Sequence, residues 1–366
     1  MALDRITLAD FRNHRSTRLE GTKRINLLVG ENGAGKTNVL EAISLFAPGR
    51  GLRRAALAEM ASQASAADSH SGGFAVSAVL DRDDGAGDVS LGTGISPERS
   101  GRRIVRVGGS EASAVSLGEW LAIAWLTPAM DRLFADSATA RRHYLDRLAV
   151  ALEPGHARIS ARYAAALRER NRLLADPTEP DAAWLESIEA QMADAGALLA
   201  QGRARLVDRL GEALAHHPDR PFARPALSYV PGGPAERDDL RRALAAARPG
   251  DRAAQRTLQG PHRDELEVRM AGKNIAAAAC STGEQKAMLI AITLAHAELA
   301  AQGRPGLLLL DEVAAHLDPI RRDALFERLD AGRAQVWLTG TERAPFAALG
   351  GDAAVWRVAS GSAERI

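Results

Sequence analysis

The stretch GENGAGKT, from Gly30 to Thr37, decides the fold. Glycine stands at its first and sixth positions and is followed by lysine and threonine, which is the pattern of a phosphate-binding loop. An apolar run, RINLLVG, comes before it, and TNVLEAISLF follows with helical spacing. A strand, a glycine-rich turn and a helix in this order direct backbone N–H groups at phosphate oxygens. The alternative is a chance glycine-rich turn, which the flanking pattern disfavours.

Each position of this loop has an expected role. The residues predicted to contact a nucleotide are Gly30, Glu31, Asn32, Gly33, Ala34, Gly35, Lys36 and Thr37. Lys36 supplies a compact positive charge to the phosphates, and Thr37 supplies a hydroxyl ligand to Mg²⁺. The chain has 47 basic residues but only four lysines, so a lysine kept at this position supports a function in phosphate binding.

An acidic pair later in the chain predicts the metal and the attacking water. LLLLDE, from Leu307 to Glu312, is an apolar run followed by two acids. The apolar run is typical of a central parallel strand, and ligands bind at the carboxyl ends of such strands. Asp311 is expected to hold Mg²⁺ through water, and Glu312 to polarise the attacking water. The candidate catalytic residues are therefore Lys36, Asp311 and Glu312, and the candidate metal ligands are Thr37 and Asp311. An acidic helix start is the alternative.

A third motif lies between these two. CSTGEQKAML, from Cys280 to Leu289, joins a Ser-Thr-Gly turn to an apolar helix-like run. Read alone, it is an ordinary N-capped helix, with Ser281 as the cap and Glu284 in the first turn. The order of loop, turn, LLLLDE and Ala315–Asp318 resembles the ABC-type ATPases. In that superfamily the turn of one subunit caps the γ-phosphate held by another. The resemblance implies an ATP-dependent homodimer in which Ser281 and Gly283 contact the partner's nucleotide.

The bulk composition sets limits on the whole chain. Its 366 residues are 46% hydrophobic and 25% charged, with a net charge of +1, so nucleic-acid binding would need a local basic patch. A single cysteine, Cys280, fits a reducing cytoplasm and excludes cysteine-built metal sites. We expect a cytoplasmic protein without a membrane span or a signal peptide.

The pattern along the chain predicts an α/β fold interrupted by helices. We expect an ATPase domain in three parts: residues 1–128 with the phosphate loop and a β-rich subregion, an inserted helical-hairpin lid domain at 129–255, and a C-terminal part at 256–366. Two long helices across the turn ADPTEP form the hairpin. The apolar stripe with Trp184, Ile188, Met192 and Leu199 is expected in its core.

Segments across nearly the whole chain resemble the RecF family of DNA replication and repair proteins, an ABC-type group related to SMC proteins. They include LADFRNHRSTRLE, ARRHYLDRL, YAAALRERNRLL, LQGPHRDEL and VWLTGTE. The resemblance implies ATP and Mg²⁺ as cofactors and an ATP-driven dimer that clamps duplex DNA beside single-stranded gaps. It also implies RecR and RecO as partners in loading RecA, and a place in the SOS response. Arg12 would reach the nucleotide, as in Rad50-like relatives. The alternative is that Arg12 is an ordinary surface arginine in a β-turn.

Two weaker features bear on this function. Thr341 stands where transporter ATPases have a histidine, so we expect slow, DNA-stimulated hydrolysis with ATP acting more as a clamp than as a fuel. Two arginine clusters, Arg50, Arg53 and Arg54, and Arg102, Arg103 and Arg106, are candidates for DNA phosphates or for an ordinary solvated surface. The other readings of the chain are an ABC-type subunit energising another complex, including a transporter, and a nucleotide-gated scaffold without turnover.

Overall fold

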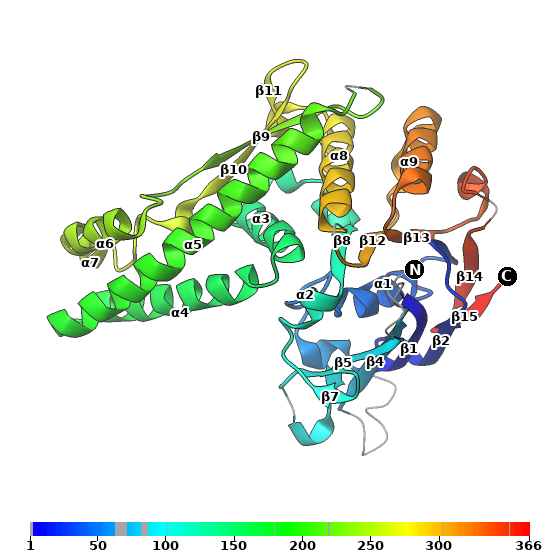
Figure 1. Cartoon of the computed structure of the whole chain (residues 1–366), viewed down its shortest axis with the longest axis horizontal. Helices are drawn as coiled ribbons and strands as arrows, with labels where there is room; N and C mark the ends of the chain where they lie inside the picture. The colour runs from blue at the N-terminus through cyan, green and yellow to red at the C-terminus, as the bar shows by residue number, and fades with distance from the viewer. Residues whose placement is uncertain are drawn as a thin grey trace. The chain divides into compact units, whose positions relative to one another are not determined.

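The computed structural model describes residues 3–62, 72–81, 87–99, 101–178, 180–218, 220–301, 303–350 and 352–366. The chain forms two compact units (Figure 1): Met1–Asp131 with Thr293–Ile366, and Arg132–Ile292. Part of the expected β-rich subregion, at residues 63–71, 82–86 and 100, lies outside the described residues. The predicted division into residues 1–128, 129–255 and 256–366 stays a prediction, as does the role of the hairpin as a lid.

A mostly parallel sheet forms the centre of the first unit. Its strand order is β15-β14-β3-β13-β12-β8, and only the edge pair β14 and β15 is antiparallel. The strands are β3 (Ile25–Val29), β8 (Ala122–Leu126), β12 (Gly306–Leu310), β13 (Gln335–Gly340), β14 (Ala354–Ala359) and β15 (Ser362–Arg365). Every residue of β3, β12 and β13, and also of the edge strand β8, is buried, as expected of a parallel sheet that is covered on both faces.

A second, antiparallel sheet in the same unit has the order β2-β1-β4-β5-β6-β7. Its strands are β1 (Leu3–Phe11), β2 (His14–Glu20), β4 (Phe74–Leu80), β5 (Val89–Ile95), β6 (Ile104–Val107) and β7 (Ser110–Glu111). Buried and exposed residues alternate along β4, which shows that one face of this sheet is covered. This sheet is the β-rich subregion expected from the sequence.

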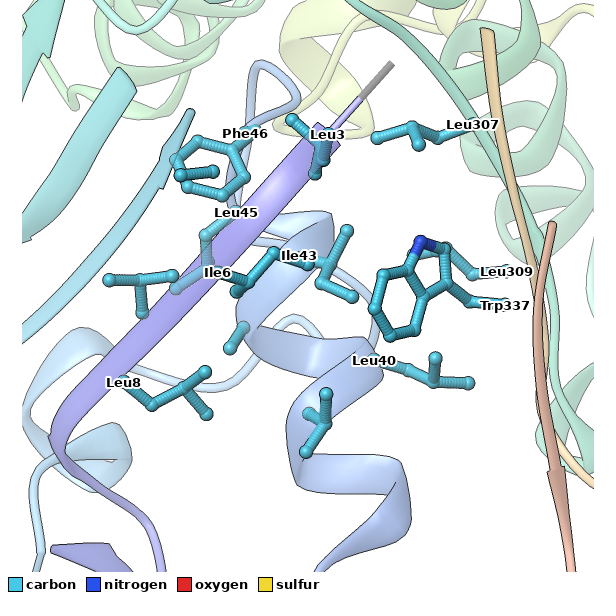
Figure 2. Packing of buried hydrophobic residues seen from close by; sticks show 14 of the residues in the cluster. Leu3, Ile6, Leu8, Leu40, Ile43, Leu45, Phe46, Leu307, Leu309 and Trp337 are labelled. Atoms are coloured by element: carbon cyan, nitrogen blue, oxygen red, sulfur yellow. The ribbon is translucent and has the colours of Figure 1, made fainter. Parts of the chain in front are cut away.

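Helix α1 (Lys36–Ser44) lies in the core that the two sheets share. Figure 2 shows Leu3, Ile6 and Leu8 of β1 on one side of this helix, and Leu307, Leu309 and Trp337 of β12 and β13 on the other. The described part of this unit also contains the helices α2 (Leu117–Trp120) and α9 (Pro319–Ala331). Because α1 is covered on both sides, the loop that precedes it is held on a rigid element.

The second unit is built on a helical hairpin, α4 (His156–Ala175) and α5 (Ala182–Ala215). Around it lie α3 (Ala138–Leu152), α6 (Arg237–Ala246), α7 (Arg248–Ala253) and the antiparallel sheet β11-β10-β9, made of β9 (Pro225–Val230), β10 (Glu265–Met270) and β11 (Ile275–Ala276). Helix α8 (Thr282–Ala300) crosses the boundary between the units at residue 292. Ile188, Met192 and Leu199 are buried in the hairpin core, as their spacing predicted.

Two expectations about side chains were wrong. Trp184 is 49% exposed, because it stands in the first turn of α5. Arg103, a candidate for DNA phosphates or a solvated surface, is instead engaged within the protein: its partly buried guanidinium donates to the carbonyl oxygens of Ala47 and Gly49, at 3.4 and 2.7 Å, and of Leu45. Burial lowers the pKa of Arg103 to about 10. No helix in the described part of the chain is long and apolar enough to cross a membrane.

The GPHRDEL segment belongs to a buried polar network of the second unit. Arg203 donates to Asp264 Oδ2 at 2.7 Å and to both carboxylate oxygens of Asp146 at 2.8 Å. Asp264 also accepts from the backbone N–H of Gly232, at 2.8 Å, and from the hydroxyl of Tyr229. The segment therefore connects the hairpin to the loop after β9 by buried charges.

Candidate active site

The predicted phosphate loop connects the end of β3 to the start of α1. Gly33 and Gly35 have φ angles of +81° and +115°, a backbone conformation that favours glycine. A β-carbon at Gly30 would lie 2.1 Å from the carbonyl oxygen of Val358, so the neighbouring strand admits only glycine there. Glycines are therefore required at these positions by the shape of the loop and by its neighbour.

Two turns of the chain hold the carbonyl groups of the loop. Asn13 Nδ2 and the backbone N–H of Gly361 both donate to Ala34 O, at 3.0 and 3.2 Å. His14 Nε2 lies 3.0 Å from Gly35 O and must carry a proton there, because a carbonyl oxygen only accepts. Burial lowers the pKa of His14. The carbonyl groups of Ala34 and Gly35 are thus held by hydrogen bonds. The N–H groups of the first turn of α1 have no partner within the helix, so they can bind an anion.

Lys36 folds back over the loop that precedes it. Its ammonium donates to Gly30 O at 2.6 Å and to Glu31 O at 2.8 Å. Burial lowers the pKa of Lys36, while the negative charges of Glu312 and Asp311 raise it. The ammonium is thus placed beside the loop and within the electric field of the acidic pair.

Asp311, at the end of β12, connects helix α1 to the end of β13. Its Oδ1 accepts the hydroxyl hydrogen of Thr37 at 2.9 Å and that of Thr339 at 2.9 Å. Within the described residues, Oδ2 of Asp311 has no hydrogen bond, so one carboxylate oxygen is left for a cation. Burial raises the pKa of Asp311, and the hydrogen bonds from Thr339 and Thr37 lower it. A carboxylate beside a threonine hydroxyl is a set of oxygen ligands that suits Mg²⁺.

Glu312 has an unusual backbone conformation. Its φ angle is +53°, which is strained for a residue with a β-carbon. The N–H of Glu312 donates to Thr339 Oγ1 at 2.8 Å. Thr339 therefore fixes both acids at once, by donating to Asp311 and accepting from Glu312. Thr341, two residues later, is exposed at the end of β13.

Arg12 is held by a buried acid of α1. Its guanidinium donates to both oxygens of Glu41, at 3.0 and 2.8 Å, and to Glu59 O at 2.7 Å. Glu41 also accepts from Arg53 at 2.9 Å, and Arg53 donates to Asn38 Oδ1 at 2.7 Å. Both guanidinium groups remain partly exposed beside α1. A role of Arg12 in nucleotide binding stays a prediction.

Ser281 is exposed at the start of α8, in the second compact unit. Its N–H and its hydroxyl both donate to Glu284 Oε2, at 2.9 Å each, and the N–H of Glu284 donates back to Ser281 Oγ at 3.3 Å. These hydrogen bonds form the capping box of an ordinary N-capped helix, with Ser281 as the cap and Glu284 in the first turn. Hydrogen bonds from Lys273 and Ser281 lower the pKa of Glu284 to about 2. Gly283 is exposed in the same turn, so a second molecule can reach both residues.

The first unit thus brings together Gly30–Thr37, Asp311 and Glu312, whereas Ser281 and Gly283 belong to the second. The sequence interpretation missed four residues that hold this site: Asn13, His14, Glu41 and Thr339. No local pattern marks them, because each acts on a residue distant in the chain. In the described ranges, no group of three or more His, Cys, Asp or Glu side chains could bind a metal by itself.

The parallel sheet, the phosphate loop, the acidic pair at the end of β12 and the turn before α8 together define an ABC-type ATPase head. A family model described as the RecF/RecN/SMC N-terminal domain matches residues 2–355. The chain belongs to the RecF family of DNA replication and repair proteins.

Curated relatives support this assignment. The DNA replication and repair protein RecF of Mesorhizobium japonicum is 47% identical over 365 residues, which cover 96% of this chain and 94% of that protein. The protein of the same name from Brucella suis biovar 1 is 45% identical over 374 residues, which cover 99% of this chain and 95% of that protein.

Solved structures share the fold. One, described as the recombination mediator protein RecF-ATPrS in the RecFOR pathway, has a TM-score of 0.86 at 22% identity and covers 100% of this chain and 98% of that chain. An Smc head domain derived from Pyrococcus furiosus has a TM-score of 0.55 at 16% identity and covers 100% of this chain and 96% of that chain. The fold class expected from the sequence is confirmed.

Proposed function

We propose that this chain is an ATP-dependent DNA-binding protein of recombinational repair and replication-fork maintenance. One observation carries the nucleotide part: Asp311 accepts hydrogen bonds from both Thr37 and Thr339, which brings the end of the phosphate loop to the acidic pair. A loop that binds phosphates and acids that bind a metal must meet in this way for phosphoryl transfer.

The residues fit MgATP. The N–H groups of Gly30–Thr37 and the ammonium of Lys36 would bind the β- and γ-phosphates, while Thr37 and Asp311 would hold Mg²⁺. The metal, when bound, neutralises charge on the phosphate oxygens. Glu312, fixed by Thr339, would orient the attacking water. We expect hydrolysis to be slow and stimulated by DNA, because Thr341 offers no general base where transporters have histidine.

The exposed turn before α8 supports a dimer. Ser281 Oγ, Gly283 N–H and the start of α8 would bind the γ-phosphate held by a second copy of the chain. ATP would then join two copies around duplex DNA beside a single-stranded gap. We propose RecR as the direct partner, with RecO and RecA acting downstream. This proposal is supported by the similar solved structures, which are described as the recombination mediator protein RecF in the RecFOR pathway. A cytoplasmic location fits these partners.

A DNA-retention experiment tests the proposal. The purified chain is mixed with gapped duplex DNA, with and without MgATP, and its association is followed by sedimentation while ATP turnover is measured. We expect ATP to increase both self-association and DNA retention. Lys36→Met removes the charge at the phosphates and should abolish the ATP-dependent part of both.

Two outcomes would contradict the proposal. If retention on DNA is the same without nucleotide, or survives Lys36→Met, the DNA function does not depend on the site. ATP-dependent dimerisation without any DNA retention would instead favour the nucleotide-gated scaffold. Lys23→Met is the matched control, since Lys23 is a partly exposed lysine whose ammonium pairs with the exposed Asp352 at 3.2 Å, outside both the phosphate loop and the turn before α8.

A further inference from the structure

Helix α4 has one apolar face and one face occupied by arginines. Tyr163, Ala166 and Leu173 are buried in the hairpin core. The exposed side chains include Arg158, Arg162, Arg168 and Arg172. At 100° per residue these four arginines fall within an arc of about 120°, and with a rise of 1.5 Å per residue they span about 21 Å along the helix. We call these four residues the α4 arginine stripe.

Most of the stripe has no acidic partner. In the part of the chain that the structure describes, Arg158, Arg162 and Arg168 make no ion pair or side-chain hydrogen bond. The only acid of α4 is Glu169, which binds Arg172 at 2.7 Å. Some other exposed arginines of this unit are paired, namely Arg205 with Glu153, Arg237 with Asp194 and Arg242 with Asp239. Arg209, Arg241 and Arg256 are also exposed, and in the described residues their side chains have no partner, but they stand on separate segments. The stripe thus differs from its surroundings because three unpaired arginines share one face of a single helix.

An arginine-rich composition does not explain this pattern. Such a bias raises the number of arginines on every surface, but it does not remove acids from one face. Helix α5, which packs against α4, exposes Glu186, Asp208 and Glu212 beside its own arginines. The charge of the hairpin is therefore separated, with an unbalanced positive face on α4.

An exposed aromatic ring extends the stripe at its C-terminal end. The guanidinium carbon of Arg172 lies 5.6 Å from the ring centroid of Trp184, which is 49% exposed. Stacking against an arginine orders this ring at the surface. A row of cations next to an exposed indole is a combination that nucleic-acid-binding surfaces use, because the cations neutralise phosphates and the ring contacts sugars or bases.

We infer that the α4 arginine stripe is a contact surface for the phosphate backbone of DNA. The inference rests on the DNA-binding function proposed above and assigns a surface to it. Guanidinium groups pair with phosphate oxygens through two parallel hydrogen bonds, and regularly spaced cations match a polyanion whose charges repeat along its length. The contact reads no base sequence, which suits a protein that binds DNA wherever a gap occurs.

A set of charge variants tests the surface. The triple variant R158Q/R162Q/R168Q removes three cations and keeps good helix formers at each position. A control, R209Q/R241Q/R256Q, removes three exposed arginines from other segments of the same unit, whose side chains have no partner among the described residues. A second triple variant, R158K/R162K/R168K, keeps the charge. Affinity for a labelled gapped duplex is measured by fluorescence anisotropy with MgATP over a range of salt concentrations.

We expect the stripe variant to bind about tenfold more weakly or worse near 0.1 M salt, with the slope of log K against log salt reduced by about 2.7, since each lost phosphate contact removes about 0.9. The arginine control and the lysine variant should stay within about threefold of the unchanged protein. If the glutamine triple variant fails to fold, R162Q alone should still reduce the slope by about 0.9.

Three outcomes would overturn the inference. The stripe variant could keep the original slope, or the arginine control could lose as much, which would make the effect one of net charge. The stripe variant could also keep its DNA affinity but lose binding to poly-glutamate, which would assign the surface to an acidic protein. Failure of the unchanged protein to bind DNA with ATP would instead contradict the proposed function itself.

Discussion

A single hydroxyl, that of Thr339, fixes the two acids of the candidate active site. It donates to Asp311 Oδ1 and accepts from the N–H of Glu312, and Thr339 is only 1% exposed. Without this acceptor, the backbone N–H that holds Glu312 in its left-handed conformation would lose its partner. The site therefore depends on a residue that lies outside both the phosphate loop and the acidic pair.

We predict that Thr339→Val lowers the rate of ATP hydrolysis by about 10- to 100-fold, because a lost hydrogen bond to a charged group costs about 1.5–3 kcal/mol. Valine has the same shape but no hydroxyl. Thr339→Ser keeps the hydroxyl and should stay near the original rate. Steady-state turnover with MgATP measures the effect, and nucleotide binding without Mg²⁺ should be unchanged in both variants. Equal losses in the valine and serine variants would contradict this role.

At the scale of the elements, buried ion pairs join the helices of the second unit. Arg203 of α5 pairs with Asp146 of α3 and with Asp264 before β10, and its side chain is 4% exposed. Two residues further along α5, Arg205 pairs with Glu153 at 3.0 Å, but its side chain is 55% exposed. These neighbours on one helix allow a direct comparison of a buried and an exposed ion pair.

We predict that Arg203→Met lowers the free energy of unfolding by about 3–5 kcal/mol, because it leaves two carboxylates buried without their cation. Arg205→Met should change it by less than about 1 kcal/mol, since an exposed pair gains little in water. Urea denaturation followed by circular dichroism of the helices measures both. Similar effects of the two changes would show that the buried network does not stabilise the unit.

The same network predicts that the free energy of unfolding depends on pH. Burial by itself raises the pKa of Asp146, but hydrogen bonds from His156 and Arg203 outweigh it and lower this pKa from 3.8 to about 2. A carboxyl group whose pKa is lower in the folded state stabilises the fold above its unfolded pKa. Its contribution, on the order of 2 kcal/mol, is lost as the pH falls from about 4 to about 2.

We therefore predict that the difference in unfolding free energy between the unchanged protein and Asp146→Asn shrinks by about 2 kcal/mol as the pH is lowered from 5 to 2. The asparagine variant cannot be protonated and lacks this part of the pH dependence. Urea midpoints measured across the pH range test it. A difference that stays constant with pH would mean that the pKa of Asp146 is not lowered in the folded protein.

At the scale of the whole molecule, the proposed ATP site would be completed by a second copy. Lys36 belongs to one compact unit and Ser281 to the other. In a two-fold dimer each nucleotide would contact Lys36 of one chain and Ser281 of its partner. A chain that lacks either residue should therefore be inactive alone.

We predict that mixing Lys36→Met chains with Ser281→Arg chains restores part of the ATP turnover that each lacks alone. A mixed dimer has one site with both intact residues and one site with neither, because the two sites are built from opposite chains. Turnover is measured across mixing ratios, with each variant alone as the control. An inactive mixture, with both variants folded, would exclude a site shared in this way.

The sequence by itself identified the elements whose pattern is local. GENGAGKT, LLLLDE and the alternation of strands and helices each fall within a few residues, so spacing and polarity were enough to predict the parallel sheet and its loop. Helical spacing likewise placed Ile188, Met192 and Leu199 in the hairpin core. Trp184 followed the same spacing but is exposed, because its position in the first turn of α5 is decided by where the hairpin ends.

Only the tertiary structure showed which residues hold these elements in place. Thr339 meets Asp311, His14 meets Gly35 and Arg203 meets Asp264 across 28, 21 and 61 positions of the chain. Arg103 was predicted, with its neighbours, to contact DNA phosphates or to lie on an ordinary solvated surface, yet it donates to the carbonyl oxygens of Leu45, Ala47 and Gly49 in a distant segment. A side chain's partner at such separations depends on how the sheets and helices pack, whereas a motif depends only on adjacent residues. For this reason the chain's motifs could be identified from its sequence, and the contacts that position them could not.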